Sequence, residues 1–227
     1  MGNSLGIRVW RLAAVAAIAW SLFTIIVLHL VSSHDPLYDT LSSYTITDHG
    51  EGMLGASVLS LSVGSVAVLG ALAAAGVPMT RTTKLLLTLW ALGLATAAMF
   101  PASYPESPNP VSGEIHLYSC LIAFMSLPGA AITFLDSLRG TAERAFVVRW
   151  LRYGLTSVAL FGLSFLFARL DEAGIAPFHL FAEALPVGVT QRLTLVADVA
   201  LLFVLIRVAV RTESARAELA VTPASRQ

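Results

Sequence analysis

Six long apolar stretches alternate with short polar segments along the chain of 227 residues. Most of them approach the roughly 20 residues that an α-helix needs to cross the hydrocarbon core of a bilayer. They cover residues 10–31, 53–77, 85–100, 115–138, 150–168 and 187–210. The pattern predicts an all-α, polytopic membrane bundle of six transmembrane helices. We expect residues 1–211 to form a single transmembrane domain and residues 212–227 a short polar cytoplasmic tail.

Composition separates this chain from soluble proteins. Hydrophobic residues make up 56% of the chain and charged residues 12%, whereas charged residues are about 25% of an ordinary soluble domain. The 14 basic and 14 acidic residues balance, so the chain has no net positive field that would attract nucleic acid. Cys120 is the only cysteine, which excludes an intramolecular disulfide and a zinc site built from several thiolates.

The basic residues indicate how the six helices are oriented, because cytoplasmic loops of membrane proteins carry an excess of Lys and Arg. Arg169 and Arg192 fall on one side of the predicted topology, and all other Lys and Arg residues fall on the side of both termini. The latter are Arg8, Arg11, Arg81, Lys84, Arg139, Arg144, Arg149, Arg152, Arg207, Arg211, Arg216 and Arg226. We therefore expect a multi-pass protein of the cell membrane with cytoplasmic N and C termini.

The same topology places every histidine, and most acidic residues, on the outer side. Any chemistry is therefore expected to face outward. A plainer interpretation stays open, because outer loops need polar side chains, and loops poor in Lys and Arg use Asp, Glu, His and Ser instead.

Three outer segments differ in character. Residues 32–44 carry spaced apolar and aromatic side chains, so we expect them to fold back on the bundle. Residues 101–110 contain four prolines, which predicts a stiff, extended cap without helix. In residues 171–186, Phe178, Phe181 and Leu185 recur at helical spacing, which favours a short helix in the membrane interface that acts as a lid or as an inert anchor.

The second apolar stretch repeats small residues, with Ala56, Ser60 and Gly64 four positions apart. Such faces let helices approach closely in lipid. We interpret this pattern as a packing surface and not as a ligand groove.

Polar residues inside the last span are costly to keep and face a protein interior or a wet cavity. Gln191 and Arg192 stand near its outer end. Asp198 lies two turns deeper and shares a face with Gln191, because seven residues make nearly two full turns. A hydrogen-bonded brace and a functional group are both open interpretations.

His116 lies one turn before Ser119 and Cys120 and follows Glu114 at the outer end of the fourth span. An imidazole there could act as a general base or a metal ligand, although a hydrogen-bonded structural histidine is the simpler explanation. A divalent cation could also draw ligands from His34, Asp35, Asp39, His49 and Glu51. None of the spacings matches an established metal motif, so the sequence predicts no metal site and no cofactor.

Signatures of other chemistry are absent from the sequence. There is no G-x-S-x-G elbow, and although Ser42 and Ser43 share a loop with His34 and Asp35, proximity in sequence does not establish a catalytic triad. Neither a Walker loop nor a dinucleotide fingerprint occurs. ATP-driven chemistry and bound nicotinamide are therefore not expected.

Several ordered pieces of the sequence resemble the DUF998 family of six-helix bacterial and archaeal membrane proteins. These pieces are Asp35-Pro36-Leu37, Leu41-Ser42-Ser43-Tyr44, Gly50, Phe100-Pro101, Gly113 to His116 and Gly188-Val189-Thr190-Gln191-Arg192. The resemblance implies a six-helix architecture and highlights Ser43, His116, Gln191 and Arg192. It implies no reaction, and Ala102-Ser103-Tyr104 stands where relatives often carry an acidic residue after Phe-Pro.

These features support one main hypothesis and two alternatives. The first is a pocket that opens to the outer leaflet and binds or transforms a lipid or isoprenoid-like substrate, as a cyclase, isomerase or hydrolase. Asp198 or Glu114 would be its acid, His116 its base and Arg192 its headgroup anchor, with Asp35, Asp39, Ser43 and Gln191 as further lining residues. The alternatives are a small transporter or export or immunity accessory, with a polar path through Asp198 and Arg192, and a noncatalytic membrane partner. Whether the protein is an enzyme, and its oligomeric state, stay open.

Overall fold

A computed structural model describes residues 2–46, 50–105 and 108–221, and in this part of the chain all regular structure is helical. Six helices are long and apolar enough to cross a membrane. They are α1 Gly2–Val31, α2 Gly50–Ala74, α3 Arg81–Met99, α4 Pro110–Phe134, α5 Glu143–Glu172 and α7 Val187–Val221. Three short helices are η1 Leu41–Ile46, η2 Leu135–Leu138 and α6 Phe178–Ala184. The prediction of an all-α protein with six candidate spans is confirmed.

The helix ends differ from the predicted spans in ways that local chemistry explains. The second span was predicted to reach residue 77, but α2 ends at Ala74 because Gly76 adopts a left-handed φ of 63°. The sequence assigned Pro110 to the extended cap, yet Pro110 begins α4. Proline fits the first turn of a helix because the backbone N–H that it lacks would have no partner there. The side chain of Asn109 caps this helix by accepting a hydrogen bond from the Ser112 backbone N–H.

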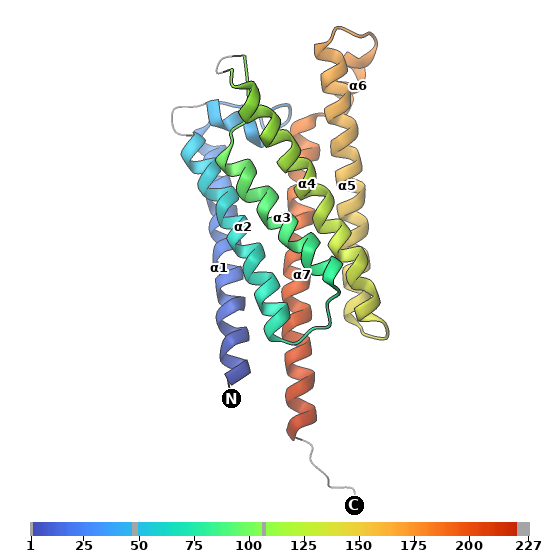
Figure 1. Ribbon diagram of the computed structural model, residues 1–227. Coiled ribbons are helices and arrows are strands. Elements are labelled where there is room, and N and C mark those ends of the chain that lie inside the picture. The colour runs from blue at the N-terminus through green and yellow to red at the C-terminus, as the bar shows by residue number, and fades with distance from the viewer. Residues whose placement is uncertain (1, 47–49, 106–107, 222–227) are drawn as a thin grey trace, which may run out of the picture.

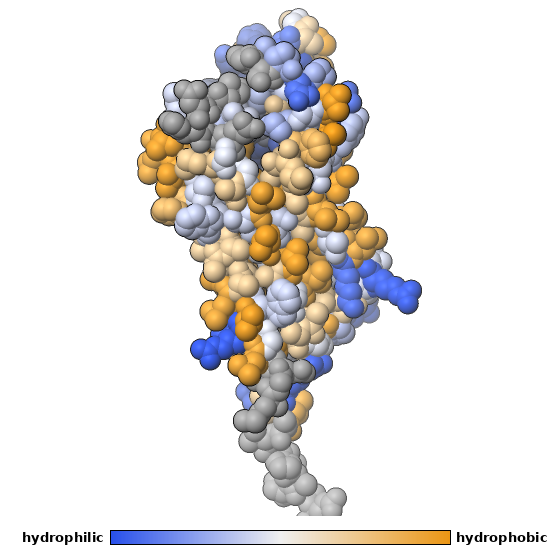
Figure 2. Space-filling view, turned by 60° about the vertical axis from the view of Figure 1, so that its left-hand side comes forward, coloured by the Kyte–Doolittle hydropathy of each residue, from blue (hydrophilic) through white to orange (hydrophobic). Residues whose placement is uncertain are grey.

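Both termini lie at the same end of the bundle, as an even number of spans requires (Figure 1). The opposite end, called here the loop end, carries residues 32–46, 100–105 and 173–186. On the face shown in Figure 2, hydrophobic residues cover much of the middle, and the most hydrophilic residues lie mainly toward the two ends. This surface suits a protein surrounded by lipid at its middle.

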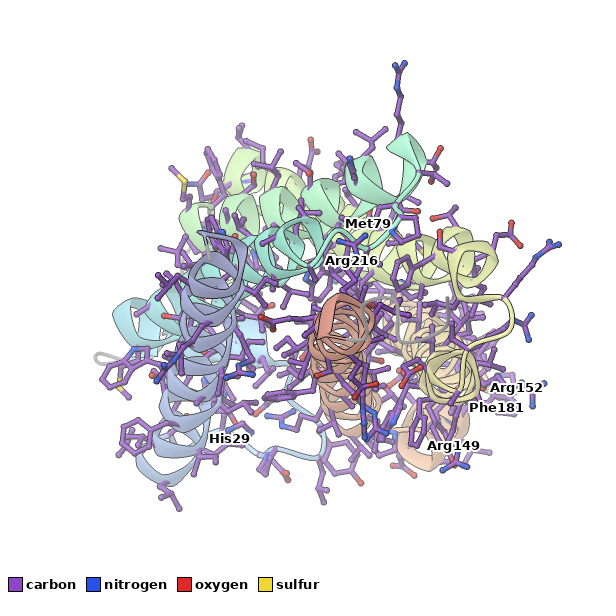
Figure 3. All side chains as sticks on the ribbon, turned by 90° about the horizontal axis from the view of Figure 1, so that it is seen from below. His29, Met79, Arg149, Arg152, Phe181 and Arg216 are labelled. Carbon is purple, nitrogen blue, oxygen red and sulfur yellow. The ribbon has the colours of Figure 1, made fainter. Side chains whose placement is uncertain are left out.

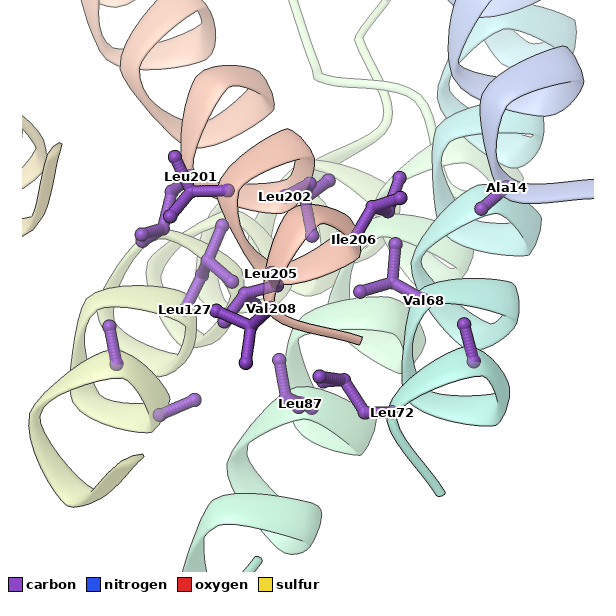
Figure 4. Close-up of a cluster of buried hydrophobic side chains, with 14 of the residues drawn as sticks. Ala14, Val68, Leu72, Leu87, Leu127, Leu201, Leu202, Leu205, Ile206 and Val208 are labelled. Atoms are coloured by element: carbon purple, nitrogen blue, oxygen red, sulfur yellow. The ribbon is translucent and has the colours of Figure 1, made fainter. Parts of the chain in front are cut away.

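Helix α7 forms the centre of the bundle. Seen from below, it lies between α1 and α5 and contacts both (Figure 3). Its side chains Leu201, Leu202 and Leu205 are fully buried, and they meet Val68 of α2 and Leu127 of α4 in one apolar cluster (Figure 4). Polar residues in the loop-end half of this helix are buried as well, namely Thr190, Gln191, Thr194 and Asp198.

The last turns of α7 extend below the bundle and include residues 212–221 of the predicted polar tail. The guanidinium group of Arg216 donates hydrogen bonds of 2.8 Å to the carbonyl oxygens of Ala75 and Gly76, where α2 ends. Figure 3 labels Arg216 together with Met79, a residue of the connection between α2 and α3. The positively charged side chain thus satisfies backbone carbonyls that have no partner within α2.

Helices α1 and α2 approach closely through small residues, among them Gly64 of the predicted packing surface, whereas Ala56 of the same repeat is exposed. A Cβ atom on Gly64 would lie 2.8 Å from a side-chain carbon of Ile18. The hydroxyl groups of Ser21 and Ser57 lie 3.1 Å apart across the same interface. Small side chains here bring the two backbones together and place polar pairs between them.

Candidate functional site

The segment after α1 folds back onto the first turn of α7, as its apolar residues predicted. The backbone N–H of Val189 donates a 3.1 Å hydrogen bond to the carbonyl of Leu37. A Cβ atom on Gly188 would lie 2.6 Å from the carbonyl oxygens of Leu37 and Asp39. Only glycine lets the segment approach α7 this closely.

Arg192 holds this segment to two helices. Its guanidinium group donates hydrogen bonds of 2.8 Å to His29 Nε2, to the carbonyl of Asp39 and to the hydroxyl of Tyr44, and one of 2.9 Å to the carbonyl of Gly188. Four of the five N–H donors of an arginine are thereby engaged. This geometry is that of a brace between α1, residues 32–40, η1 and α7.

Asp35 and Asp39 organise the turn that follows α1. Asp39 Oδ2 accepts a 2.9 Å hydrogen bond from the Asp35 backbone N–H and lies 3.1 Å from His34 Nδ1. Asp35 Oδ1 accepts from the Leu37 backbone N–H at 2.8 Å. The two carboxylates therefore stabilise the conformation of their own loop.

The metal ligands considered from the sequence do not converge in the part of the chain that the structure describes, where no group of three or more His, Cys, Asp or Glu side chains is placed to hold an ion. His49 lies outside the described residues, and so does the side chain of Glu51.

His116 connects three elements at the loop end. Its Nδ1 atom lies 3.0 Å from the carbonyl oxygen of Ala97 and 2.9 Å from that of Phe100, at the end of α3. Because carbonyl oxygens only accept hydrogen bonds, Nδ1 carries a hydrogen, and in the neutral imidazole Nε2 is then the acceptor. The Ser42 hydroxyl, 3.0 Å from Nε2, then donates to it. The thiol of Cys120 lies 3.5 Å from the same nitrogen.

A cavity of about 120 Å³ opens beside this histidine, between α1, α2, α3, α4 and α7. Its walls are mainly apolar, from residues such as Ile25, Leu54, Leu94 and Leu195. Its polar lining comprises Ser21, Ser42, Thr45, His116, Cys120 and Gln191. The cavity thus combines an apolar interior with a small number of hydrogen-bonding side chains, as ligand sites do.

Gln191 reaches both the cavity and the loop. Its Oε1 atom accepts a 2.6 Å hydrogen bond from the backbone N–H of Leu41, which fixes the orientation of the amide. The amide nitrogen has no hydrogen-bond partner among the described residues. Gln191, a residue of the cavity lining, therefore keeps an amide donor that no described residue engages.

Asp198 lies deeper along the same face of α7. Its exposure is 0%, and neither carboxyl oxygen has a hydrogen-bond partner in the described part of the chain. Leu195, one turn above, lines the cavity, whereas Asp198 is not part of the lining. The described residues show no contact between Asp198 and Arg192, the two members of the expected polar path.

The remaining candidates lie away from the cavity. Ser43 is buried, and its hydroxyl donates a 2.6 Å hydrogen bond to the carbonyl of Thr40. Glu114 is exposed on the first turns of α4 and does not line the cavity. Helix α6 does not line it either, because Phe178 and Phe181 pack their rings against Phe167 of α5.

The structure therefore divides the predicted site residues into groups. His116 and Gln191 line one cavity, whereas Asp35, Asp39, Ser43 and Arg192 hold the loop in place. Sequence reasoning did not select Ser42 and Tyr44. Residues 41–46 form a 3₁₀-helix, which has three residues per turn and therefore places Ser42 and Thr45 on the same face. The three-residue spacing of these two hydroxyl residues is the signal that the sequence offered.

Comparison of the chain with curated proteins and with solved structures found no match. A family model described as Protein of unknown function (DUF998) matches residues 14–208, which extend from the first span into the last. The described chain forms the six-helix architecture that the resemblance implied. The protein belongs to the DUF998 family.

Proposed function

We propose that this protein binds a lipid or isoprenoid-like molecule in the cavity beside His116. The observation that carries the proposal is the division of the lining into apolar walls and a cluster of polar side chains around Nε2 of His116. An amphiphile has the same division between chain and headgroup. Membrane lipids are therefore the partners that this chemistry fits best.

The size of the cavity indicates how such a molecule would lie. A cavity of about 150 Å³ accommodates benzene, so a space of about 120 Å³ holds only a headgroup or the first part of a chain. The rest of the chain would extend between helices into the bilayer.

The proposed orientation places the loop end, and with it the cavity, in the extracytoplasmic leaflet of the cell membrane. Nearly all Lys and Arg residues belong to the end of the bundle that carries both termini. Because basic loops stay in the cytoplasm, this distribution supports cytoplasmic termini. A substrate would enter laterally from the outer leaflet.

If the protein is an enzyme, we propose His116 as its general base. A cyclase or isomerase also needs an acid at the substrate, and the two acids expected from the sequence, Glu114 and Asp198, are not part of the cavity lining. Binding or hydrolysis is therefore favoured over acid-catalysed cyclisation. Arg192 is less suited as the headgroup anchor, because protein atoms engage four of its five N–H donors.

Native mass spectrometry with co-purified lipids tests the proposal. Leu195→Phe places a larger side chain in the cavity lining and reduces the space inside the cavity. Leu193→Phe makes the same change at an exposed position of α7. We expect a bound lipid in the wild type and in Leu193→Phe, and its loss from a folded Leu195→Phe variant. Equal lipid retention by both variants would contradict the pocket, and a wild type without any lipid would favour a noncatalytic membrane partner.

Transport is a second candidate function, favoured by Asp198. Ionisable groups inside spans mark ion and substrate paths, and this carboxyl group is fully buried with no partner in the described chain. The candidate predicts that Asp198→Asn abolishes pH-dependent substrate flux in reconstituted vesicles. Unchanged flux in a folded variant would exclude this role for Asp198.

A further inference from the structure

We infer that Ser42 and His116 form the nucleophile and the base of an acyl-transfer site that cleaves an ester-linked lipid. The inference rests on the proposed function, because the cavity beside the two residues is the binding place for the lipid. It adds to the hydrolase alternative a nucleophile, an acyl-enzyme step and an ester linkage in the substrate.

The first argument is the geometry around the imidazole. An activated serine needs a base within about 2.6–3.2 Å and a third group that orients the base. Ser42 Oγ lies 3.0 Å from Nε2 of His116, and the carbonyls of Ala97 and Phe100 hold Nδ1 at 3.0 and 2.9 Å. Two backbone carbonyls thus occupy the orienting place that an aspartate has in a Ser-His-Asp triad. They also face the positive charge that the ring acquires when it takes the serine proton.

The second argument is the free donor of Gln191. Acyl transfer develops negative charge on the carbonyl oxygen of the substrate, and a preorganised N–H donor stabilises that charge. Gln191 lines the cavity, its amide nitrogen has no partner among the described residues, and Oε1 accepts from the backbone N–H of Leu41, next to Ser42. The hydrogen bond to Leu41 prevents the amide from turning its oxygen toward the substrate.

The reaction balances with water as the only co-reactant. Ser42 Oγ forms a bond to the ester carbonyl carbon while its proton moves to Nε2 of His116. The tetrahedral intermediate then expels the alcohol, which receives that proton, and leaves the acyl group esterified to Ser42. Water gives a proton to His116 as it attacks the acyl carbon. Release of the carboxylic acid returns the proton to Ser42.

Cys120 is the competing nucleophile, because its thiol also lies near Nε2. The distance of 3.5 Å is longer than the 3.0 Å to Ser42. Cys120 and His116 belong to the same helix, whereas Ser42 comes from the loop-end element η1. Both groups are within hydrogen-bond reach of Nε2, because sulfur is larger than oxygen. The proposal assigns the acyl group to Ser42, and covalent labelling distinguishes it from Cys120.

Covalent labelling tests the nucleophile directly. Purified full-length protein in detergent micelles is treated with a decyl fluorophosphonate, and the modified peptide is identified by mass spectrometry. We expect modification of Ser42 that is abolished in Ser42→Ala and slowed in His116→Gln. Ser33→Ala, which removes an exposed serine of the same loop, is the matched control and should label like the wild type. Labelling of Cys120, labelling that persists in Ser42→Ala, or an unlabelled wild type would each overturn the assignment.

Hydrolysis of p-nitrophenyl octanoate measures the full reaction. A positioned base contributes about a hundredfold or more to the rate, so we expect at least that loss in a folded His116→Gln variant and a comparable loss in Ser42→Ala. Unchanged rates in both variants would contradict the mechanism. Thermal unfolding curves of each variant confirm that it is folded.

The two proposals fail in different ways. A wild type that holds a lipid lost in Leu195→Phe but gives no Ser42 adduct retains the binding pocket and overturns acyl transfer. An adduct on Ser42 in a protein that retains no lipid overturns the lipid pocket and the lipid substrate together.

Discussion

Gln191 Oε1 accepts a 2.6 Å hydrogen bond from the backbone N–H of Leu41, across 150 positions of sequence. The amide oxygen of Gln191 thereby holds η1, the element that carries Ser42, and Gln191 also lines the cavity. Gln191→Glu keeps an oxygen acceptor for Leu41 but removes the N–H donor. We expect kcat for ester hydrolysis to fall by about a hundredfold, the size of effect seen when one oxyanion donor is removed.

The loss should affect kcat more than KM, because the donor acts on charge that develops in the transition state. Thermal unfolding checks that Gln191→Glu is folded, because a carboxyl group at this buried position lowers stability. A variant with wild-type kcat would exclude Gln191 from the reaction.

Gly188→Ala tests the contact between residues 32–40 and α7. The new Cβ would lie within 2.7 Å of the carbonyl oxygens of Pro36, Leu37 and Asp39, so loop or helix must move. Overpacking of this kind costs about 1–3 kcal/mol, and we expect a clearly lower unfolding temperature in detergent. Gly162→Ala in α5, where nothing lies within 4 Å of the added carbon, is the control. Equal unfolding temperatures would show that the loop does not pack as described.

Arg192→Lys tests the brace at the loop end. A lysine keeps the positive charge but cannot span His29, Tyr44 and two carbonyls with one ammonium group. We expect faster hydrogen exchange and faster proteolysis of residues 32–40. Arg169→Lys, at an exposed arginine paired with Glu172, should leave both unchanged. Wild-type protection of the segment in Arg192→Lys would contradict the role of the guanidinium group.

Asp198→Leu tests the cost of the buried carboxyl group. A buried polar group without a hydrogen bond costs about 1–3 kcal/mol, and both oxygens of Asp198 lack partners in the described structure. We expect a higher unfolding temperature for the apolar variant of similar size. If the variant is less stable than the wild type, Asp198 has a partner that compensates its burial.

Tyr104 predicts a specific response to alkaline pH. Burial raises the pKa of its phenol above the ordinary value of 10.0, and a 3.4 Å hydrogen bond with Thr40 opposes that shift. Above about pH 10 the unfolded chain loses this proton while the folded protein keeps it, so the stability of the fold falls as pH rises. Tyr104→Phe should lessen this fall, whereas Tyr38→Phe, at an exposed position, should follow the wild-type curve. Identical pH profiles for all three proteins would contradict the shift.

The sequence by itself determined the number of spans, their helical character and the return of both termini to one end. These properties depend on the length and composition of local segments, because each span must satisfy its own backbone hydrogen bonds in lipid. The small residues of the second span indicated a packing surface, and Gly64 of that surface meets Ile18 of α1. The DUF998 relationship was also recognisable from ordered local motifs.

Only the tertiary structure decided what the polar residues do. Arg192 and Gln191 are neighbours in sequence, yet helical rotation directs Arg192 to His29 and Tyr44 and places Gln191 at the cavity. Sequence reasoning selected Ser43 as a lining residue, whereas the fold brings its neighbour Ser42 to His116. This contact joins residues 74 positions apart, so it depends on how η1, α3 and α4 pack against one another and not on local spacing.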